Sequence, residues 1–167
     1  MTLQNHHKET FGSYHWIFLG LPSPLPETLI GNDPNFYMTH TINSWTGTNL
    51  KGKLNAEAMK SWVSQYDDPH VVTGALEDYR AGANIDCEHD LLDEQAGKDG
   101  VECSLLVLYS VHLSRRFDVE GVWTKLAKGA FRSVQIGDEG TGHFLPVEAP
   151  EQTTNEVVQW IEGINFE

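Results

Sequence analysis

A continuous apolar run, Ser104 to Ser110, most constrains how this chain can fold. It reads Ser-Leu-Leu-Val-Leu-Tyr-Ser and is bounded by polar segments. A run of this length is typical of a strand buried on both faces, as in a parallel sheet covered by helices. A helical pattern from Val119 to Lys128 and a second strand pattern from Phe131 to Ile136 follow it. We therefore expect a parallel α/β sheet in the later part of the chain.

The end of the chain continues this alternation. Gly137 to Pro146 is expected to be a loop, and Pro150 to Ile164 a closing helix on which Val157, Val158 and Ile161 share a face. Two strands are too few for such a sheet, because a buried apolar strand needs paired neighbours and an open apolar edge invites aggregation. We therefore expect the chain to be incomplete and to lack earlier strands.

The first part of the chain has a different pattern, with no convincing strand from about residue 5 to residue 94. It predicts short helices separated by prolines and glycines. We expect a helical domain over 1–96 and an α/β part over 97–167. The predicted helices are Lys8 to Leu21, ending at Pro22-Ser23-Pro24; Asp33-Pro34 to Trp45; Asn55 through Val63; and Asp68-Pro69 to Gly82.

Composition narrows the function classes. The net charge of −13 opposes binding to nucleic acids and anionic membranes, which needs clustered cations, so a small or neutral partner is expected. No stretch approaches the ~20 apolar residues that span a bilayer, and the N-terminus has no signal-peptide pattern. Cys87 and Cys103 form no metal or disulfide motif, which favours reduced packing residues in a cytoplasmic protein. No metal or cofactor is expected.

The loop Gly140-Thr141-Gly142-His143-Phe144-Leu145-Pro146 is the strongest candidate for chemistry. A histidine in a strand-to-helix loop is exposed while strand and helix fix its position, which suits a general base. No Gly-x-Ser-x-Gly motif or comparable turn carrying Asp or Cys appears in the chain, so the sequence supplies no nucleophile for it. Asp118 and Asp138 are candidates for the acid that would orient His143.

Several motifs occur together in one order along the chain. They are Tyr14-His15-Trp16, Gly31-Asn32-Asp33-Pro34, Glu77-Asp78-Tyr79-Arg80-Ala81-Gly82, Ile85-Asp86-Cys87-Glu88-His89-Asp90, Arg116-Phe117-Asp118 before Trp123, and Gly142-His143-Phe144 before Glu148-Ala149-Pro150-Glu151. Taken with the helical first part and the strand, helix, strand, His-loop and helix that follow, these motifs resemble the C-terminal half of the haloacetate dehalogenases, which are α/β-hydrolases with a helical cap domain. The resemblance covers nearly the whole chain.

The resemblance implies a cap domain over 1–96, the last β-α-β-α units of the hydrolase core, and a small haloacid substrate. In that family an aspartate displaces the halide and forms an ester, and a histidine activates the water that hydrolyses it. His143 resembles that histidine, and His15, Trp16 and Tyr79 resemble the side chains that receive the halide. The nucleophile, its neighbouring arginines, the oxyanion hole and the orienting acid have no counterpart here, so we expect the chain to be inactive by itself.

Other interpretations remain open. Epoxide hydrolysis uses the same aspartate and histidine chemistry, with a cap tyrosine donating to the epoxide oxygen. A non-catalytic binding or dimerisation module, including a homodimer, is an alternative from a different class, because missing strands leave apolar surface for a partner to cover. His15 and Trp16 on an aromatic helix would ordinarily be packing residues. The acidic run from Asp86 to Glu94 is expected to be a solvated helix face.

Overall fold

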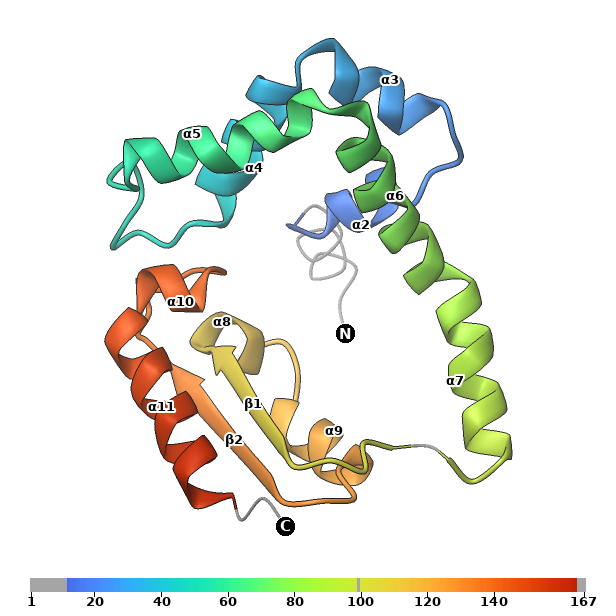
Figure 1. The fold of residues 1–167 in the computed structure, drawn as a ribbon, viewed down its shortest axis with the longest axis vertical. Helices are drawn as coiled ribbons and strands as arrows, with labels where there is room; N and C mark the ends of the chain where they lie inside the picture. The colour runs from blue at the N-terminus through green and yellow to red at the C-terminus, as the bar shows by residue number, and fades with distance from the viewer. Residues whose placement is uncertain (1–11, 99, 165–167) are drawn as a thin grey trace, which may run out of the picture. The chain divides into compact units, whose positions relative to one another are not determined.

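A computed structural model describes residues 12–98 and 100–164 of the chain. The fold is mostly helical with a small parallel sheet (Figure 1). Two compact units are present, and each is described by itself. The first comprises the described part of Met1–Thr39 with Ala56–Gly97, and the second comprises His40–Asn55 with the described part of Lys98–Glu167. The assignment of 1–96 to a cap domain and of 97–167 to a hydrolase core stays a prediction.

The first unit is helical throughout its described residues. α4 begins in this unit and ends in the second. The helices are α2 (Tyr14–Leu19), α3 (Leu25–Asn32), α4 (Pro34–Trp45), α5 (Ala56–Ser64), the 3-10 helix η1 (Gln65–Asp67), α6 (Pro69–Ala83) and α7 (Ile85–Gln95).

Capping explains where two of these helices begin. The Asp68 carboxylate accepts a hydrogen bond from the backbone N–H of His70 at 2.9 Å, and Pro69 occupies the first turn of α6. The Asp33 carboxylate accepts from Phe36 N–H at 2.9 Å at the start of α4. Both starts agree with the sequence prediction. The predicted helix from Lys8 to Leu21 is confirmed only as α2, and Lys8 to Phe11 lie outside the described residues.

α3 was not predicted. Pro22-Ser23-Pro24 was interpreted only as the end of the preceding helix, but α3 begins directly after it, and Pro26 lies in its first turn, where a missing N–H costs nothing. Ile30 of α3 packs with Leu19, Val72 and Leu76 into the core of the first unit. A segment that looked like a connection therefore supplies part of the core.

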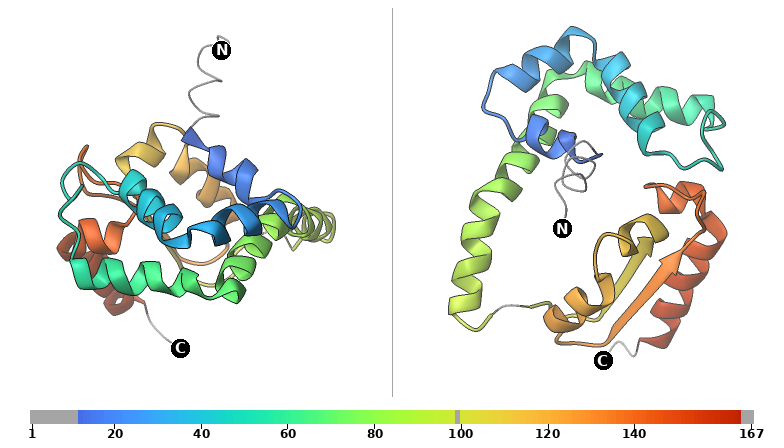
Figure 2. Two further views of the ribbon diagram at one scale, coloured as in Figure 1. Left: turned by 90° about the horizontal axis from the view of Figure 1, so that it is seen from above. Right: turned by 180° about the vertical axis from the view of Figure 1, so that it is seen from behind.

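The second unit contains the sheet. β1 (Leu105–Ser110) pairs in parallel with β2 (Phe131–Ile136), and Leu105 is in register with Phe131. The remaining helices of the unit are α8 (Val111–Ser114), α9 (Val119–Leu126), α10 (Leu145–Glu148) and α11 (Pro150–Gly163). α11 contacts both strands and runs beside them in Figure 1 and in the right-hand view of Figure 2. The strand, helix, strand, helix order and the parallel pairing confirm the predicted α/β class.

Two details differ from the sequence predictions, the burial of β1 and that of the cysteines. All six residues of β1 are only half-buried, whereas burial on both faces was expected. On α11, Val157, Val158 and Ile161 are exposed, and the helix turns the face carrying Thr153 and Trp160 inward. Cys87 and Cys103 are exposed thiols and not packing residues. The acidic run in α7 is a solvated face as expected, since α7 has no buried residue.

Candidate active site

The loop that carries His143 begins where β2 ends. Ile136 is fully buried, and the next residue, Gly137, has φ +75°, a left-handed conformation that side chains other than glycine rarely adopt. The Gly137 N–H donates to the side chain of Gln152 on α11 at 2.8 Å. The chain therefore turns sharply off the sheet and is tied to the closing helix before it reaches the histidine.

Asp138 organises the turn that follows. Its carboxylate accepts from the Gly140 N–H and from the Asn49 side-chain amide, both at 2.8 Å. The Thr141 hydroxyl donates to that carboxylate at 3.4 Å and accepts a hydrogen bond from the Asp138 N–H at 3.0 Å. The Gly140 N–H and then the Asn49 amide hold the pKa of Asp138 below its ordinary value, while partial burial opposes them. Asp138 is therefore engaged in the turn itself.

Asp118 has a different local role. Its carboxylate accepts from the Gly121 N–H at 3.0 Å and caps α9. Within residues 12–98 and 100–164, neither this aspartate nor Asp138 makes a hydrogen bond to the His143 ring. Neither arrangement supports an acid that orients the histidine.

His143 itself is exposed and is fixed through its backbone. Its N–H donates to the carbonyl of Trp45, the last residue of α4, at 2.9 Å. The imidazole lies beside the Trp45 ring, with centroids 5.2 Å apart, and beside the Phe144 ring at the same separation. The main chain and two aromatic neighbours thus restrict the position of the ring and leave it accessible, as a water-activating base requires.

The segment after α4 was given no role in the site from the sequence, yet it meets the histidine loop directly. Asn49 N–H donates to the Gly140 carbonyl at 3.1 Å, and Gly47 N–H donates to the carboxylate of Glu148 at 2.8 Å. No local sequence signal connects residues about 100 positions apart, so Trp45, Gly47 and Asn49 were missed as site residues. Glu148 lay within a quoted motif, five residues after His143, but was given no role.

The three predicted halide-contact residues lie together in the first unit. Tyr79 of α6 has its ring centroid 6.3 Å from that of His15 and 6.5 Å from that of Trp16, both on α2. The His15 and Trp16 centroids are also 6.3 Å apart. Trp16 is 69% exposed. The pKa of Tyr79 is raised, first by burial and then by electrostatic interaction with Tyr66 and Asp78. Residues 63 positions apart thus form one aromatic cluster.

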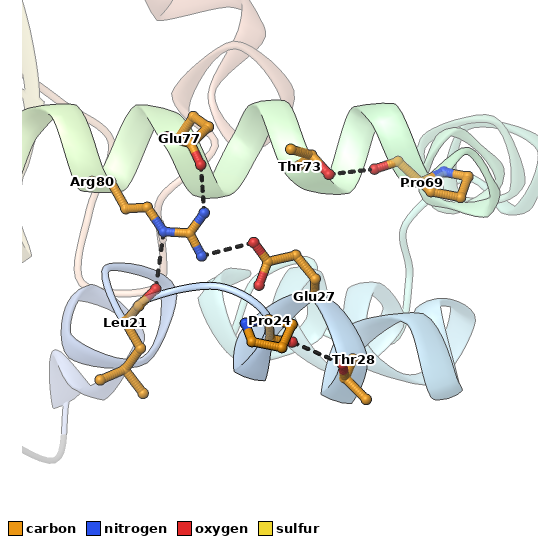
Figure 3. Close-up of polar contacts among 8 residues, drawn as sticks. All are labelled: Leu21, Pro24, Glu27, Thr28, Pro69, Thr73, Glu77 and Arg80. Carbon is orange, nitrogen blue, oxygen red and sulfur yellow. Dashed lines mark hydrogen bonds and ion pairs between the residues drawn. The ribbon is translucent and has the colours of Figure 1, made fainter.

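Arg80, next to Tyr79 on α6, holds that helix against the segment that follows α2 (Figure 3). Its Nε donates to the Leu21 carbonyl at 2.9 Å, and its guanidinium pairs with Glu27 at 2.8 Å and Glu77 at 2.5 Å. Burial alone would raise the pKa of Glu27, but hydrogen bonds from its backbone, Arg80 and Ser23 outweigh burial and lower it. These contacts restrict how far α6 can shift relative to α2.

No group of three or more His, Cys, Asp or Glu side chains suited to a metal occurs among the described residues. In the same part of the chain, no helix is both long and apolar enough to cross a lipid bilayer.

Comparison with known proteins identifies relatives of this arrangement. A fluoroacetate dehalogenase from Burkholderia sp is 33% identical over 143 residues, which are 84% of this chain and 44% of that protein. A Pseudomonas aeruginosa protein assigned as an epoxide hydrolase has a structure that matches 92% of this chain with a TM-score of 0.78 and 28% identity. No protein-family model matches the chain.

The chain has the fold of part of an α/β-hydrolase. A Salmonella enterica structure assigned as an acyltransferase also matches, with a TM-score of 0.81, 26% identity and coverage of 93% of this chain and 50% of its own. The chain spans about half the length of the relatives it matches. Their names include a dehalogenase, an epoxide hydrolase and an acyltransferase, so the shared fold by itself does not define the reaction.

Proposed function

We propose that this protein contributes the water-activating histidine and the halide contacts of a haloacetate dehalogenase-type reaction. The observation that carries the proposal is the placement of His143 in the loop after β2. Its imidazole is exposed, and its backbone N–H donates a hydrogen bond to the Trp45 carbonyl at 2.9 Å. The 33% identity to a fluoroacetate dehalogenase supports this choice of reaction. The proposed substrate is a small haloacid.

The proposed chemistry has two steps. A carboxylate oxygen of the nucleophile attacks the halogen-bearing carbon and forms an ester, and the halide leaves with the electron pair of the broken bond. His143 then takes a proton from water while the water oxygen attacks the ester carbonyl. The ester C–O bond breaks, the proton on His143 passes to the departing alkoxide oxygen to give the hydroxy acid, and the other water proton is released as the carboxylate is restored. The 167 residues contain no strand-to-helix nucleophile motif, so we propose that this chain has no turnover by itself.

The aromatic cluster is the proposed halide site. Imidazole N–H, indole N–H and phenol O–H groups are donors able to stabilise an anion that develops in a pocket with little water. The raised pKa of Tyr79 favours a phenol that keeps its proton and can donate it. The centroid separations of 6.3 to 6.5 Å among His15, Trp16 and Tyr79 support a shared role.

Two measurements test the proposal on the 167-residue chain. A fluoride electrode should detect no fluoride release from fluoroacetate, and release that His143→Ala abolishes would show that the chain needs no outside nucleophile. Chloride titration followed by NMR should shift the Trp16 indole N–H, identified by its loss in Trp16→Phe. The shift should be reduced in Tyr79→Phe, and no shift at any chloride concentration would remove the halide assignment.

Epoxide hydrolysis is a second candidate, favoured by the similarity to the Pseudomonas aeruginosa structure. In that reaction Tyr79 would donate to the epoxide oxygen, and a diol would be the product. The pair of nitrogen donors beside Tyr79 favours a halide, since an epoxide oxygen does not require three donors. This candidate would be favoured if adding a terminal epoxide shifts the Trp16 signal and adding chloride does not.

Location and partners are also proposals. The exposed thiols of Cys87 and Cys103, neither in a disulfide, support a cytoplasmic location. The large exposed side chains of Trp16, Ile17 and Phe36 support a binding or dimerisation surface as the alternative to catalysis. A discrete dimer in sedimentation equilibrium, lost in a variant with these three side chains replaced by serine, would support that alternative.

A further inference from the structure

The carboxylate of Glu148 accepts three backbone hydrogen bonds at the end of α10. Oε2 accepts from the N–H groups of Gly47 and Gly142, both at 2.8 Å, and Oε1 accepts from Phe144 N–H at 2.9 Å. Gly142 and Phe144 flank His143 in the sequence. One half-buried side chain therefore holds the main chain immediately before and after the histidine.

The same carboxylate joins this loop to a distant segment. Gly47 lies 101 residues before Glu148, and its N–H shares Oε2 with Gly142. The two backbones approach so closely that a Cβ at Gly142 would overlap Gly47 N and the Trp45 carbonyl oxygen. Trp45 supplies both the acceptor for His143 N–H and a ring beside the imidazole. Glu148 thus holds together the two segments that surround His143.

The charge matters as well as the shape. A carboxylate has only acceptors, and its hydrogen bonds to N–H groups are shorter and stronger than those of a neutral group. A glutamine of the same size accepts at one oxygen only, so its NH₂ group would face a backbone N–H donor. At least one of the three N–H groups would lose its partner, and a partly buried donor without an acceptor is costly.

We propose that Glu148 is the positioning residue of His143. It fixes the main chain on both sides of the histidine and keeps Trp45 beside the imidazole, and it does not itself contact the reacting atoms. The catalytic meaning of this role rests on the proposed function of His143, but the positioning itself is measurable without turnover.

The test uses NMR of the full 167-residue chain. The ring C–H signals of His143, identified by their loss in His143→Gln, should carry a ring-current shift from Trp45 that Trp45→Leu removes. Glu148→Gln should move these signals toward the values of a solvent-exposed histidine. Glu151→Gln is the matched control, because it removes the same charge from the first turn of α11 and should leave the His143 signals unchanged.

Amide hydrogen exchange gives a second measurement. The N–H groups of Gly47, Gly142 and Phe144 should exchange at least about tenfold faster in Glu148→Gln than in the wild type, since each relies on this carboxylate. Unchanged His143 ring signals in Glu148→Gln, even with a lower melting temperature, would reduce Glu148 to an ordinary stabilising residue. If Glu148→Gln does not fold, exchange in the wild type decides: fast exchange of all three amides overturns the proposal.

The outcomes separate the two hypotheses. A displaced His143 signal in Glu148→Gln supports positioning whether or not chloride shifts the Trp16 indole. Absence of a halide response in the wild type removes the dehalogenase proposal and leaves the positioning result intact. If the His143 signals are unchanged in Glu148→Gln while chloride shifts the Trp16 indole signal normally, the positioning proposal fails and the dehalogenase proposal stands.

Discussion

The backbone of Gly47 packs against Gly140 so closely that a Cβ at residue 47 would overlap the Gly140 carbonyl oxygen. Gly142 and Thr141 occupy the remaining space on that side. The segment after α4 and the histidine loop are therefore in main-chain contact, which only a residue without a side chain allows.

Gly47→Ala should destabilise the protein by about 1–3 kcal/mol, because the obstructing atoms belong to the backbone and cannot move aside. Urea unfolding measures the change. Gly74→Ala is the matched control, since Gly74 is exposed within α6 with nothing within 4 Å of its Cβ position, and the change should stabilise by up to about 1 kcal/mol. Equal effects at the two positions would contradict the close packing at Gly47.

Leu76→Ala should lower the free energy of unfolding by about 2–5 kcal/mol, because Leu76 is 0% exposed and the vacated space lies among Leu19, Ile30 and Val72. Leu92→Ala on α7 removes the same atoms from a residue that is 60% exposed and should change little. Chemical denaturation of the two variants side by side tests whether α3 contributes to the core. A small cost at Leu76 would mean that Ile30 and its helix do not pack as described.

Arg80→Gln should lower the urea midpoint, because Glu27 then loses its cationic partner and the Leu21 carbonyl loses its donor. Arg115→Gln is the comparison, since its pair with Glu139 is exposed on both sides and such pairs add little. The aromatic cluster provides a local readout. If Arg80→Gln displaces the Tyr79 ring, the fluorescence of the neighbouring Trp16 should change. Identical midpoints for both variants would argue against the role of Arg80 in holding α6.

Asp138 should make stability depend on pH on the acid side. Its pKa is lower in the folded state than in the unfolded chain, so its contribution is present above the ordinary aspartate pKa of about 3.9 and is lost as the pH falls toward the folded value. Asp138→Asn should flatten the decline in unfolding free energy between neutral pH and about pH 3. Asp90→Asn, an exposed position on α7, should leave the slope unchanged. Parallel curves for Asp138→Asn and the wild type would exclude this contribution.

The local patterns in the sequence were sufficient for much of the secondary structure. The aspartate-proline pairs at 33–34 and 68–69 predicted the starts of α4 and α6, because capping and proline placement act over a few residues. The apolar run predicted β1, and the strand pattern after the intervening helix predicted β2 with the observed bounds Phe131–Ile136. The ordered motifs also predicted the α/β-hydrolase relationship that the dehalogenase and epoxide hydrolase comparisons support.

Contacts between distant segments were not predictable in this way. The exposure of Val158 and Ile161 depends on which face of α11 turns toward the strands, and helical periodicity does not define that rotation. α3 was missed because Pro22-Ser23-Pro24, just before it, resembles a break until the packing of Ile30 is seen. The four-residue helices α8 and α10 are too short to produce a periodic pattern.

The sequence by itself determined the class of the fold, the two strands and the candidate base His143, because these depend on local patterning and on motifs in order. Only the tertiary structure showed how that histidine is held. The His143 N–H donates to the carbonyl of Trp45, and the Glu148 side chain accepts from the N–H groups of both Gly47 and Gly142, so segments about 100 residues apart are joined. The donors and the Trp45 acceptor are backbone groups that every residue carries, so their pairing leaves no signature in the sequence and emerges only when the chain brings the two loops together.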